Sequence, residues 1–363
     1  MQTEEVMKMS VKRENWGRLP SGQEVTRYTM VNRLGASVSL CDYGAIITSI
    51  CVPDKEGHLS DVALGFDHLE GYLKDHGCMG DTVGRYGNRI AKGRFVLDGV
   101  TYQLDCNNGE NHLHGGFQGF SSRVWEAQAE EGEGFDHVQM HRVSADGEEG
   151  YPGELDVCVS FTWDDDCNLI IRYQAETDKP TLCNLTQHTY FNLAGHDHGT
   201  IADHELMVAA DVITPVRDSG LIPTGAYMPV AGTPFDLRNG LLLGEGLAKT
   251  QACTQMRYAG GYDHNFVLRK GETMGLAARL RHAKSGRAME VLTDQPGVQL
   301  YTACATEYDG GKGGAHYGQY SALCLETQHC PDSPNQPQFP GTTVLRPGER
   351  YDKTTIYAFR VEK

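Results

Sequence analysis

Short runs in which apolar and polar residues alternate recur along most of this chain. Clear examples are EVTRYTMVN, GRFVLDGVTYQL, LDVCVSFTW, NLIIRYQAE, HELMVAADVITPV, VQLYTACAT and TTIYAFRV, which are rich in Val, Ile, Thr, Tyr and Phe. A period of two places successive side chains on opposite faces of an extended strand. The pattern therefore predicts a chain built mainly of β-strands.

The segments between these runs predict tight turns and only a few short helices. Asp98-Gly99 suits the positive φ angles of a type I′ hairpin turn, and WDDDCN separates two further strand runs. Helical periodicity is limited to HLEGYLKD and GLLLGEGLAKT. Because helices do not alternate regularly with strands, we predict an all-β fold, a large antiparallel β-sandwich, in place of a parallel doubly wound sheet.

The organisation of the chain indicates a single domain. A length of 363 residues allows one large β domain or two ordinary ones. The sequence contains no low-complexity linker and no internal repeat that would divide it. We therefore expect residues 1–363 to form one domain.

Charge narrows the range of partners. The formal net charge is −16 at pH 7, and a surface of that sign repels phosphate backbones and anionic lipids. We therefore expect no nucleic-acid or membrane partner, and a neutral small molecule is the favoured ligand. The segment MQTEEVMKMSVKRENWG lacks the apolar core of a signal peptide, so we expect a cytoplasmic protein.

The cysteines indicate a reducing environment. The chain has 11 of them, scattered without a CxxC pair, and several lie inside strand runs such as LDVCVSF. Free buried cysteine behaves as a small hydrophobic residue. Reduced core thiols are therefore predicted rather than disulfides or a metal cluster.

Five segments combine polar side chains with strand formers, so that burial would require polar partners. Each residue alone has an ordinary structural explanation: Arg89 can lie on a strand surface, His188 can be a hydrogen-bonded core histidine, and Glu326 can pair with a lysine. The segments are GRYGNRIAKG (84–93), NNGENHLHGG (107–116), NLTQHTYFNLAG (184–195), YDHNF (262–266) and LETQ (325–328).

Together these segments resemble the aldose 1-epimerase (mutarotase) family. VAGTPFDLR, PGVQLYT and LETQHCPDSPNQP fit the same family in the same order, so the resemblance runs from about Trp16 to Phe359. One departure is Gly87, where the family more often has alanine; it removes no functional group. The resemblance implies a large antiparallel β-sandwich and interconversion of the α and β anomers of a free aldohexose. We expect a monomer or weak homodimer, and D-galactose and D-glucose remain alternative substrates.

The resemblance also implies a role for each site residue. It makes Glu326 the general base, His188 the general acid and His114 an auxiliary histidine, with Asn88, Arg89, Asp263 and Gln299 as sugar-binding residues. The aromatic residues Tyr190, Phe191 and Phe235 could cover the apolar face of a sugar ring, or could equally pack in the core.

These residue types suit mutarotation, which moves protons without lasting covalent change. The C1 hydroxyl loses a proton while the ring oxygen gains one; the ring opens, C1–C2 rotates, and the ring closes on the other carbonyl face. A carboxylate can accept the first proton, and an imidazole, which titrates near neutral pH, can give the second. The sequence has no phosphate loop and no dinucleotide-binding motif, so we expect no cofactor.

Four other functions compete with this reading. HLH (112–114) and HDH (196–198) could each place two histidines on one side of a strand, but HExxH is missing, so we expect no metal. A glycoside hydrolase would use two carboxylates, whereas the partner of Glu326 is a histidine. A lectin-like module would bind sugar without reaction. A hexose-6-phosphate 1-epimerase would need a basic cluster, for which only Arg85 and Arg89 are candidates.

Overall fold

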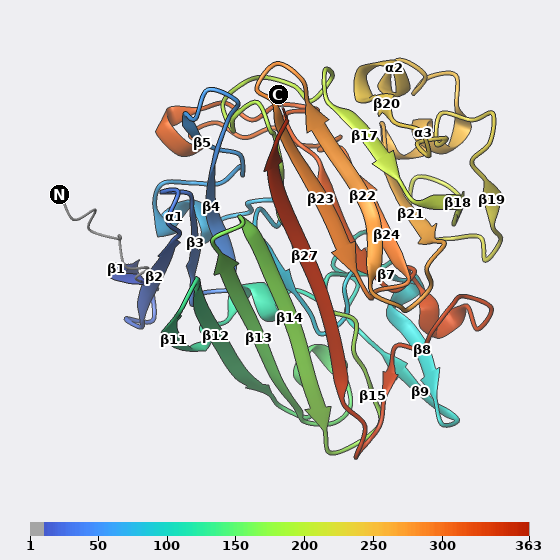
Figure 1. Ribbon diagram of the computed structural model, residues 1–363. Helices are drawn as coiled ribbons and strands as arrows, with labels where there is room; N and C mark the ends of the chain where they lie inside the picture. The colour runs from blue at the N-terminus through green and yellow to red at the C-terminus, as the bar shows by residue number, and fades with distance from the viewer. Residues whose placement is uncertain (1–10, 363) are drawn as a thin grey trace.

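The computed structural model of the protein describes residues 11–362 and consists mainly of antiparallel sheets (Figure 1). The largest is a nine-stranded sheet in which long strands lie side by side across the front of the molecule. In sheet order its strands are β11 (Glu126–Gly132), β12 (Phe135–Ser144), β13 (Leu155–Asp164), β14 (Asn168–Thr177), β27 (Tyr351–Val361), β23 (Arg287–Thr293), β22 (Gly275–His282), β17 (Glu205–Val208) and β20 (Leu241–Leu242).

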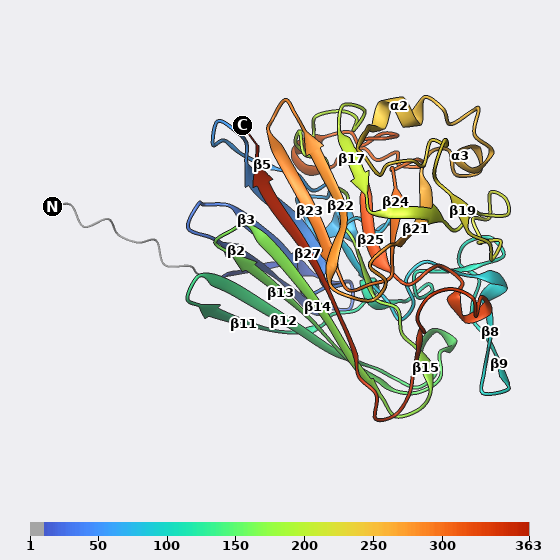
Figure 2. The ribbon, with the colours of Figure 1, turned by 45° about the vertical axis from the view of Figure 1, so that its right-hand side comes forward.

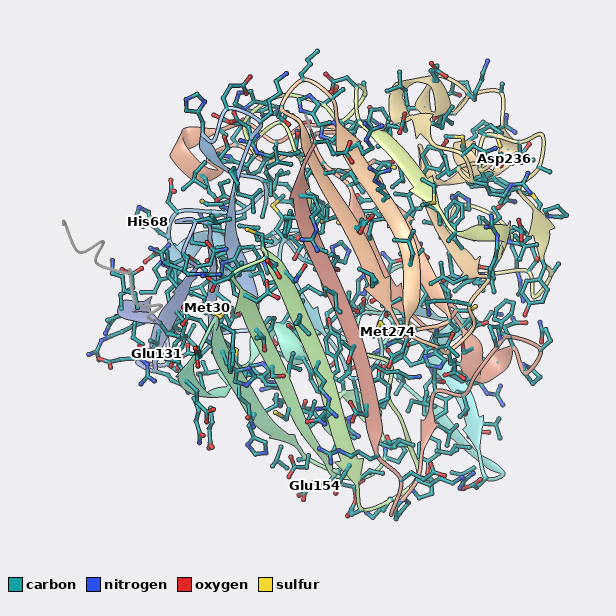
Figure 3. The ribbon with its side chains drawn as sticks, viewed as in Figure 1. Met30, His68, Glu131, Glu154, Asp236 and Met274 are labelled. Atoms are coloured by element: carbon teal, nitrogen blue, oxygen red, sulfur yellow. The ribbon has the colours of Figure 1, made fainter. Side chains whose placement is uncertain are left out.

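Alternation in the sequence sets the two faces of this sheet. In β13, every second residue from Leu155 to Trp163 is buried, and the residues between them are exposed or half-buried. The buried face packs into a core that also contains Val38 and Ile47. Acidic residues such as Glu131 and Glu154 are exposed at the rim of the sheet (Figure 3).

A second sheet of five strands, near the N-terminus, covers part of that core. In order, its strands are β1 (Lys12–Arg18), β2 (Glu24–Val31), β3 (Ser37–Cys41), β4 (Ile46–Pro53) and β5 (Leu59–Asp61).

A third sheet, also of five strands, carries much of the candidate site. Figure 2 shows β21, β24 and β25 alongside one another, to the right of the long strands. The sheet order is β19 (Met228–Pro229), β18 (Ala210–Ile213), β21 (Asp263–Leu268), β24 (Gly297–Tyr301) and β25 (Cys324–Gln328). Four short pairs complete the strands: β10 (His112–Leu113) with β7 (Arg89–Ile90), β15 (Thr181–Leu182) with β26 (Val344–Leu345), β16 (Thr186–His188) with β6 (Asp81–Val83), and β8 (Arg94–Leu97) with β9 (Val100–Gln103).

Helices are few and short. They are α1 (Leu69–Tyr72), α2 (Leu243–Leu247) and α3 (Thr254–Ala259), with 3₁₀ turns η1 (Ala91–Gly93), η2 (Phe120–Ser122), η3 (Glu148–Gly150), η4 (Lys312–Gly314) and η5 (Ser333–Asn335). Both predicted helical segments contain a helix, α1 and α2, but each helix is only about one turn long. Within residues 11–362, no helix has the length and apolar character needed to cross a bilayer.

The all-β prediction is confirmed, and so is the predicted hairpin turn. Asp98 (φ 50°) and Gly99 (φ 80°) both have positive φ between β8 and β9, as a type I′ turn requires. All 11 cysteines fall within the described residues as free thiols, but core burial holds for only five of them, Cys41, Cys167, Cys183, Cys324 and Cys330.

Candidate active site

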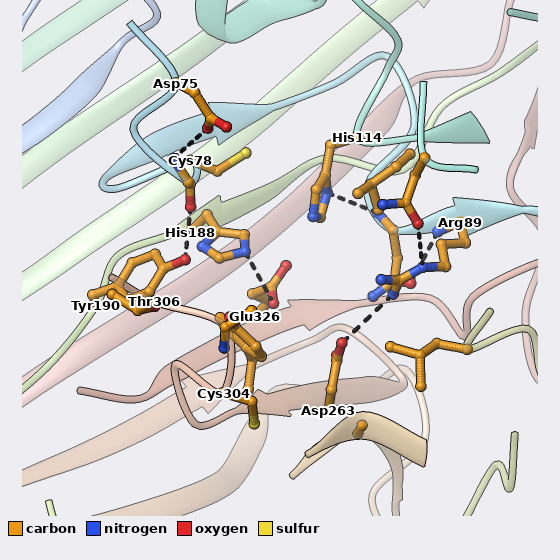
Figure 4. A pocket seen from close by; sticks show the side chains of 18 of the residues that line it. Asp75, Cys78, Arg89, His114, His188, Tyr190, Asp263, Cys304, Thr306 and Glu326 are labelled. Atoms are coloured by element: carbon orange, nitrogen blue, oxygen red, sulfur yellow. Dashed lines mark hydrogen bonds and ion pairs between the residues drawn. The ribbon is translucent and has the colours of Figure 1, made fainter. Parts of the chain in front are cut away.

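A cavity of about 490 Å³ opens where the third sheet meets the loops around β7, β10 and β16 (Figure 4). Six of the seven predicted site residues line it, although they come from widely separated parts of the sequence. They are Asn88, Arg89, His114, His188, Asp263 and Glu326. Gln299, the seventh, does not line the cavity and lies beneath it.

Glu326 lies in the middle of β25, where all five residues are buried. The residue is 1% exposed, and Oε1 of its carboxylate lies 3.6 Å from Nε2 of His188. The other oxygen, Oε2, has no hydrogen-bond partner among the described residues. Burial raises the pKa of Glu326 well above its usual value, and Asp263 adds to that rise.

His188 ends β16, and the antiparallel register places it opposite Asp81 of β6. Its ring packs against that of Tyr190 at 5.1 Å between centroids, and Nδ1 lies 3.5 Å from Sγ of Cys324. Burial lowers the pKa of His188 to about 4, although Asp81 acts in the opposite direction. Both shifts disfavour the charged forms, so burial favours a neutral imidazole beside a protonated Glu326, a pair that shares one proton.

His114 follows β10 in the left-handed region (φ 51°), and its ring meets that of His188 edge to face at 5.2 Å. The backbone N–H of Asn88 donates to Nδ1 of His114 at 3.1 Å. A nitrogen that accepts a hydrogen bond carries no proton, so the proton of the neutral ring is on Nε2. Burial lowers the pKa of His114 well below its usual value. The ring of His114 is therefore neutral and carries its N–H at Nε2.

Arg89 and Asp263 form the polar wall opposite the two histidines. The guanidinium Nη1 of Arg89 lies 3.7 Å from Oδ2 of Asp263, and its Nε donates to Oδ1 of Asn108 at 3.3 Å. The amide of Gln299 donates to Oδ1 of Asp263 at 2.5 Å. In the structure Gln299 therefore orients Asp263 from below; direct contact with a sugar remains a prediction for it.

Several cavity residues were not predicted. Asn107 and Asn108 lie in the NNGENHLHGG segment and Tyr301 lies in PGVQLYT, so the motifs contained the signal. Asp75, Cys78, Cys304 and Tyr308 come from segments without a motif. Of the three aromatic candidates, Tyr190 lines the cavity, whereas Phe191 and Phe235 belong to the core and are fully buried.

His114, His188 and Glu326 also bring one potential metal-ligating atom each within 4.8 Å of one another. Two observations argue against a metal there. The three atoms fall within 4.8 Å of one another, whereas the ligand atoms of a tetrahedral zinc with bonds of about 2.0 Å would lie roughly 3.3 Å apart. In addition, Nδ1 of His114 accepts the Asn88 N–H, so ligation through Nε2 would leave two N–H groups facing each other. The chemistry of these residues fits proton transfer better.

Three comparisons place the chain among known proteins. A family profile described as aldose 1-epimerase matches residues 26–358. The galactose mutarotase of Mus musculus is 48% identical over 356 residues, which cover 97% of this chain and 99% of that protein. The aldose 1-epimerase of Escherichia coli is 36% identical over 345 residues, 94% and 97% of the two chains. The solved structure of galactose 1-epimerase from Lactobacillus acidophilus is 28% identical, has a TM-score of 0.85, and covers 98% of this chain and 100% of its own.

Proposed function

The chain belongs to the aldose 1-epimerase family, and we propose that it interconverts the α and β anomers of free hexoses such as D-galactose and D-glucose, with Glu326 and His188 moving the protons. The observation that carries the proposal is the convergence of these two side chains. Their Oε1 and Nε2 atoms lie 3.6 Å apart in a cavity that also holds hydrogen-bonding groups for hydroxyls. The two oxygens on the anomeric carbon of a pyranose can therefore face both groups at once.

One shared proton is enough for both halves of the reaction. With the proton on His188, the Glu326 carboxylate takes the proton of the C1 hydroxyl while the imidazolium gives its own to the ring oxygen. The pyranose becomes the open aldehyde, and the pair becomes protonated Glu326 with neutral His188. After rotation about C1–C2, protonated Glu326 gives its proton to the aldehyde oxygen while neutral His188 takes the proton of the C5 hydroxyl, and the ring closes on the other face. Burial favours the second form, which is the form that closes the ring.

The remaining groups orient the sugar. Asp263, held by Arg89 and Gln299, accepts hydrogen bonds from neighbouring hydroxyls, and the Arg89 guanidinium donates in a fixed plane. The Nε2–H of His114 donates to an oxygen near the anomeric carbon, which stabilises negative charge on O1 during ring opening. Asn88 adds an amide side chain at the same wall.

Two rival activities fit the site less well. A hexose 6-phosphate would need basic side chains for its phosphate, yet Arg85 is 2% exposed and donates to the carbonyls of Pro152, Gly153 and Ser144. A glycoside hydrolase would need a second carboxyl group as proton carrier. Asp263 is already engaged by two donors, whereas the group beside Glu326 is a histidine.

Polarimetry tests the proposed activity. Freshly dissolved α-D-galactose or α-D-glucose should reach its equilibrium rotation faster with the protein than without it. The rate should stay the same after treatment with EDTA, because proton transfer between side chains needs no metal. A rate that EDTA abolishes and zinc restores would contradict the mechanism, and release of nitrophenol from a nitrophenyl galactoside would identify a hydrolase instead.

The pH profile tests the shared proton. Because the pKa of His188 is lowered to about 4 and that of Glu326 is raised, kcat/KM should be flat through neutral pH. It should fall below about pH 4, where His188 takes a second proton and the pair loses its base. It should fall again in alkali, where Glu326 loses the only proton. A profile with a midpoint near 6.5, the ordinary value for histidine, would contradict this assignment.

We also propose that the enzyme is a single functional domain that acts in the cytoplasm as a monomer or weak homodimer. The site residues come from one chain and extend from Asn88 to Glu326. The 11 free thiols suit a reducing compartment. Light scattering at micromolar concentration and limited proteolysis would test the oligomeric state and the number of domains.

A further inference from the structure

The mechanism above leaves unused a buried ion pair directly behind His188. His76 lies just before β6, and its Nε2 is 2.7 Å from Oδ1 of Asp81, whose side chain is 1% exposed. Asp81 is the residue opposite His188 in the β6–β16 register. Directly opposite residues of an antiparallel pair point to the same face of the sheet, with Cβ atoms about 5 Å apart. The Asp81 carboxylate therefore faces the catalytic imidazole.

The hydrogen bonds of His76 define its charge. Its Nδ1 lies 3.0 Å from the carbonyl oxygen of Lys74, and its Nε2 faces the Asp81 carboxylate. Both partners only accept hydrogen bonds, so each ring nitrogen must carry a proton and the ring is an imidazolium. Asp81 raises the pKa of His76 to about 9. The positive charge of His76 is therefore present at neutral pH.

We infer that the His76–Asp81 ion pair is a positioning unit for His188. The pair adjusts the proton affinity of the His188 imidazole so that the ring can both give a proton to the ring oxygen and take it back. This inference rests on the proposed function. The Asp81 carboxylate favours the imidazolium form of His188, which opens the ring. The positive charge of His76, the ion-pair partner of Asp81, limits that effect. The neutral form of His188, which closes the ring, therefore remains accessible.

Other groups also face His188, and they define the background against which this pair acts. They are Glu326 and Cys324 on β25, Tyr301 on β24, Asp263 on β21, Arg89 on β7, His114 after β10, Cys78 before β6, and Tyr190 on the segment of His188 itself. Burial raises the pKa values of the thiols of Cys78 and Cys324 and of the phenols of Tyr190 and Tyr301, so these four stay neutral. Among the charged neighbours, Asp81 is the one placed opposite His188 by strand register.

Two substitutions should move the acid limb of kcat/KM in opposite directions. Asp81→Asn removes the negative charge and should shift the midpoint to lower pH by about one unit, the usual effect of one close charge. His76→Gln keeps a donor toward Asp81 but removes the positive charge, so the midpoint should rise by about one unit. The double variant should lie between the two. A structural role alone would change the height of the profile and not its midpoint.

The control is a matched pair outside the cavity. His141 on β12 lies 2.8 Å from Asp156, and His141→Gln should leave the midpoint in place. If Asp81→Asn and His76→Gln also leave the midpoint of the acid limb in place, or move it in the same direction, the inference is wrong. The proposed function still stands in that case, provided that the wild-type protein anomerises galactose. If neither variant folds, ¹⁵N NMR of the histidines in the wild-type protein provides the test. The His76 ring should keep both of its protons up to about pH 9. Titration of the His76 ring near pH 6.5 would overturn the inference.

Discussion

Replacing Glu326 by glutamine is expected to reduce the rate of anomerisation by about 10²–10⁴-fold, the usual contribution of one positioned proton carrier. Glutamine has nearly the same size but cannot accept the C1 proton. The loss should appear in kcat, because the hydroxyl contacts proposed for Arg89 and Asp263, which lie 3.7 Å from each other, do not depend on the carboxylate. Polarimetry on α-D-galactose, corrected for the spontaneous reaction, measures this loss directly.

The same substitution should leave the protein folded and increase its stability at neutral pH. Because burial raises the pKa of Glu326 in the folded state, folding must protonate a group that is ionised when unfolded above its usual pKa of about 4.3. This cost is absent below that pH, grows as pH rises, and disappears in Glu326→Gln. The melting temperatures of variant and wild type should therefore converge in acid and separate toward neutral pH. A variant that keeps the full rate would show that Glu326 is not the base.

The features of the fold that depend on local sequence were predictable. Alternation identified β13 and β14, and Asp98-Gly99 identified the β8–β9 turn, because side-chain direction and φ are properties of a few neighbouring residues. What alternation cannot give is the choice of strand partners. β14 pairs with β27, roughly 180 residues later in the chain, and their paired residues run from Asn168–Ala358 to Ala175–Tyr351.

The run HELMVAADVITPV shows the same limit within one segment. It alternates as a single strand would, yet it divides into β17 of the nine-stranded sheet and β18 of the third sheet. The helix α3 was also missed. It has only six residues, too few to show a helical period, and it ends at Gly260 in the left-handed conformation.

The family motifs supplied the candidate site residues, and the structure brings most of them together. Six of the seven residues line one cavity, but the motifs could not distinguish a residue that faces the cavity from one that supports it, and Gln299 proved to lie behind Asp263. No motif drew attention to His76 and Asp81. Their closeness to His188 depends on the β6–β16 register, which the sequence does not specify.

Replacing His188 by asparagine is expected to have the second large effect, and the comparison with His114 makes the test specific. His188→Asn removes a group that exchanges a proton with the ring oxygen, so the rate should again fall by about 10²–10⁴-fold. His114→Asn removes only a neutral donor. Asparagine tolerates the positive φ of position 114, and its side-chain oxygen can accept the Asn88 N–H. We expect about a tenfold loss, the value of one hydrogen bond.

The pH profiles should separate the two histidines further. His114→Asn should keep the acid limb near pH 4, because His188 is still present to take the second proton. His188→Asn should lose that limb, since its residual activity no longer depends on an imidazole beside Glu326. The reverse result, a large loss in His114→Asn with the acid limb abolished, would exchange the two roles. The hydrogen bond from Asn88 to Nδ1 of His114 argues against such an exchange, because a ring that also accepts at Nδ1 cannot become an imidazolium without losing that bond.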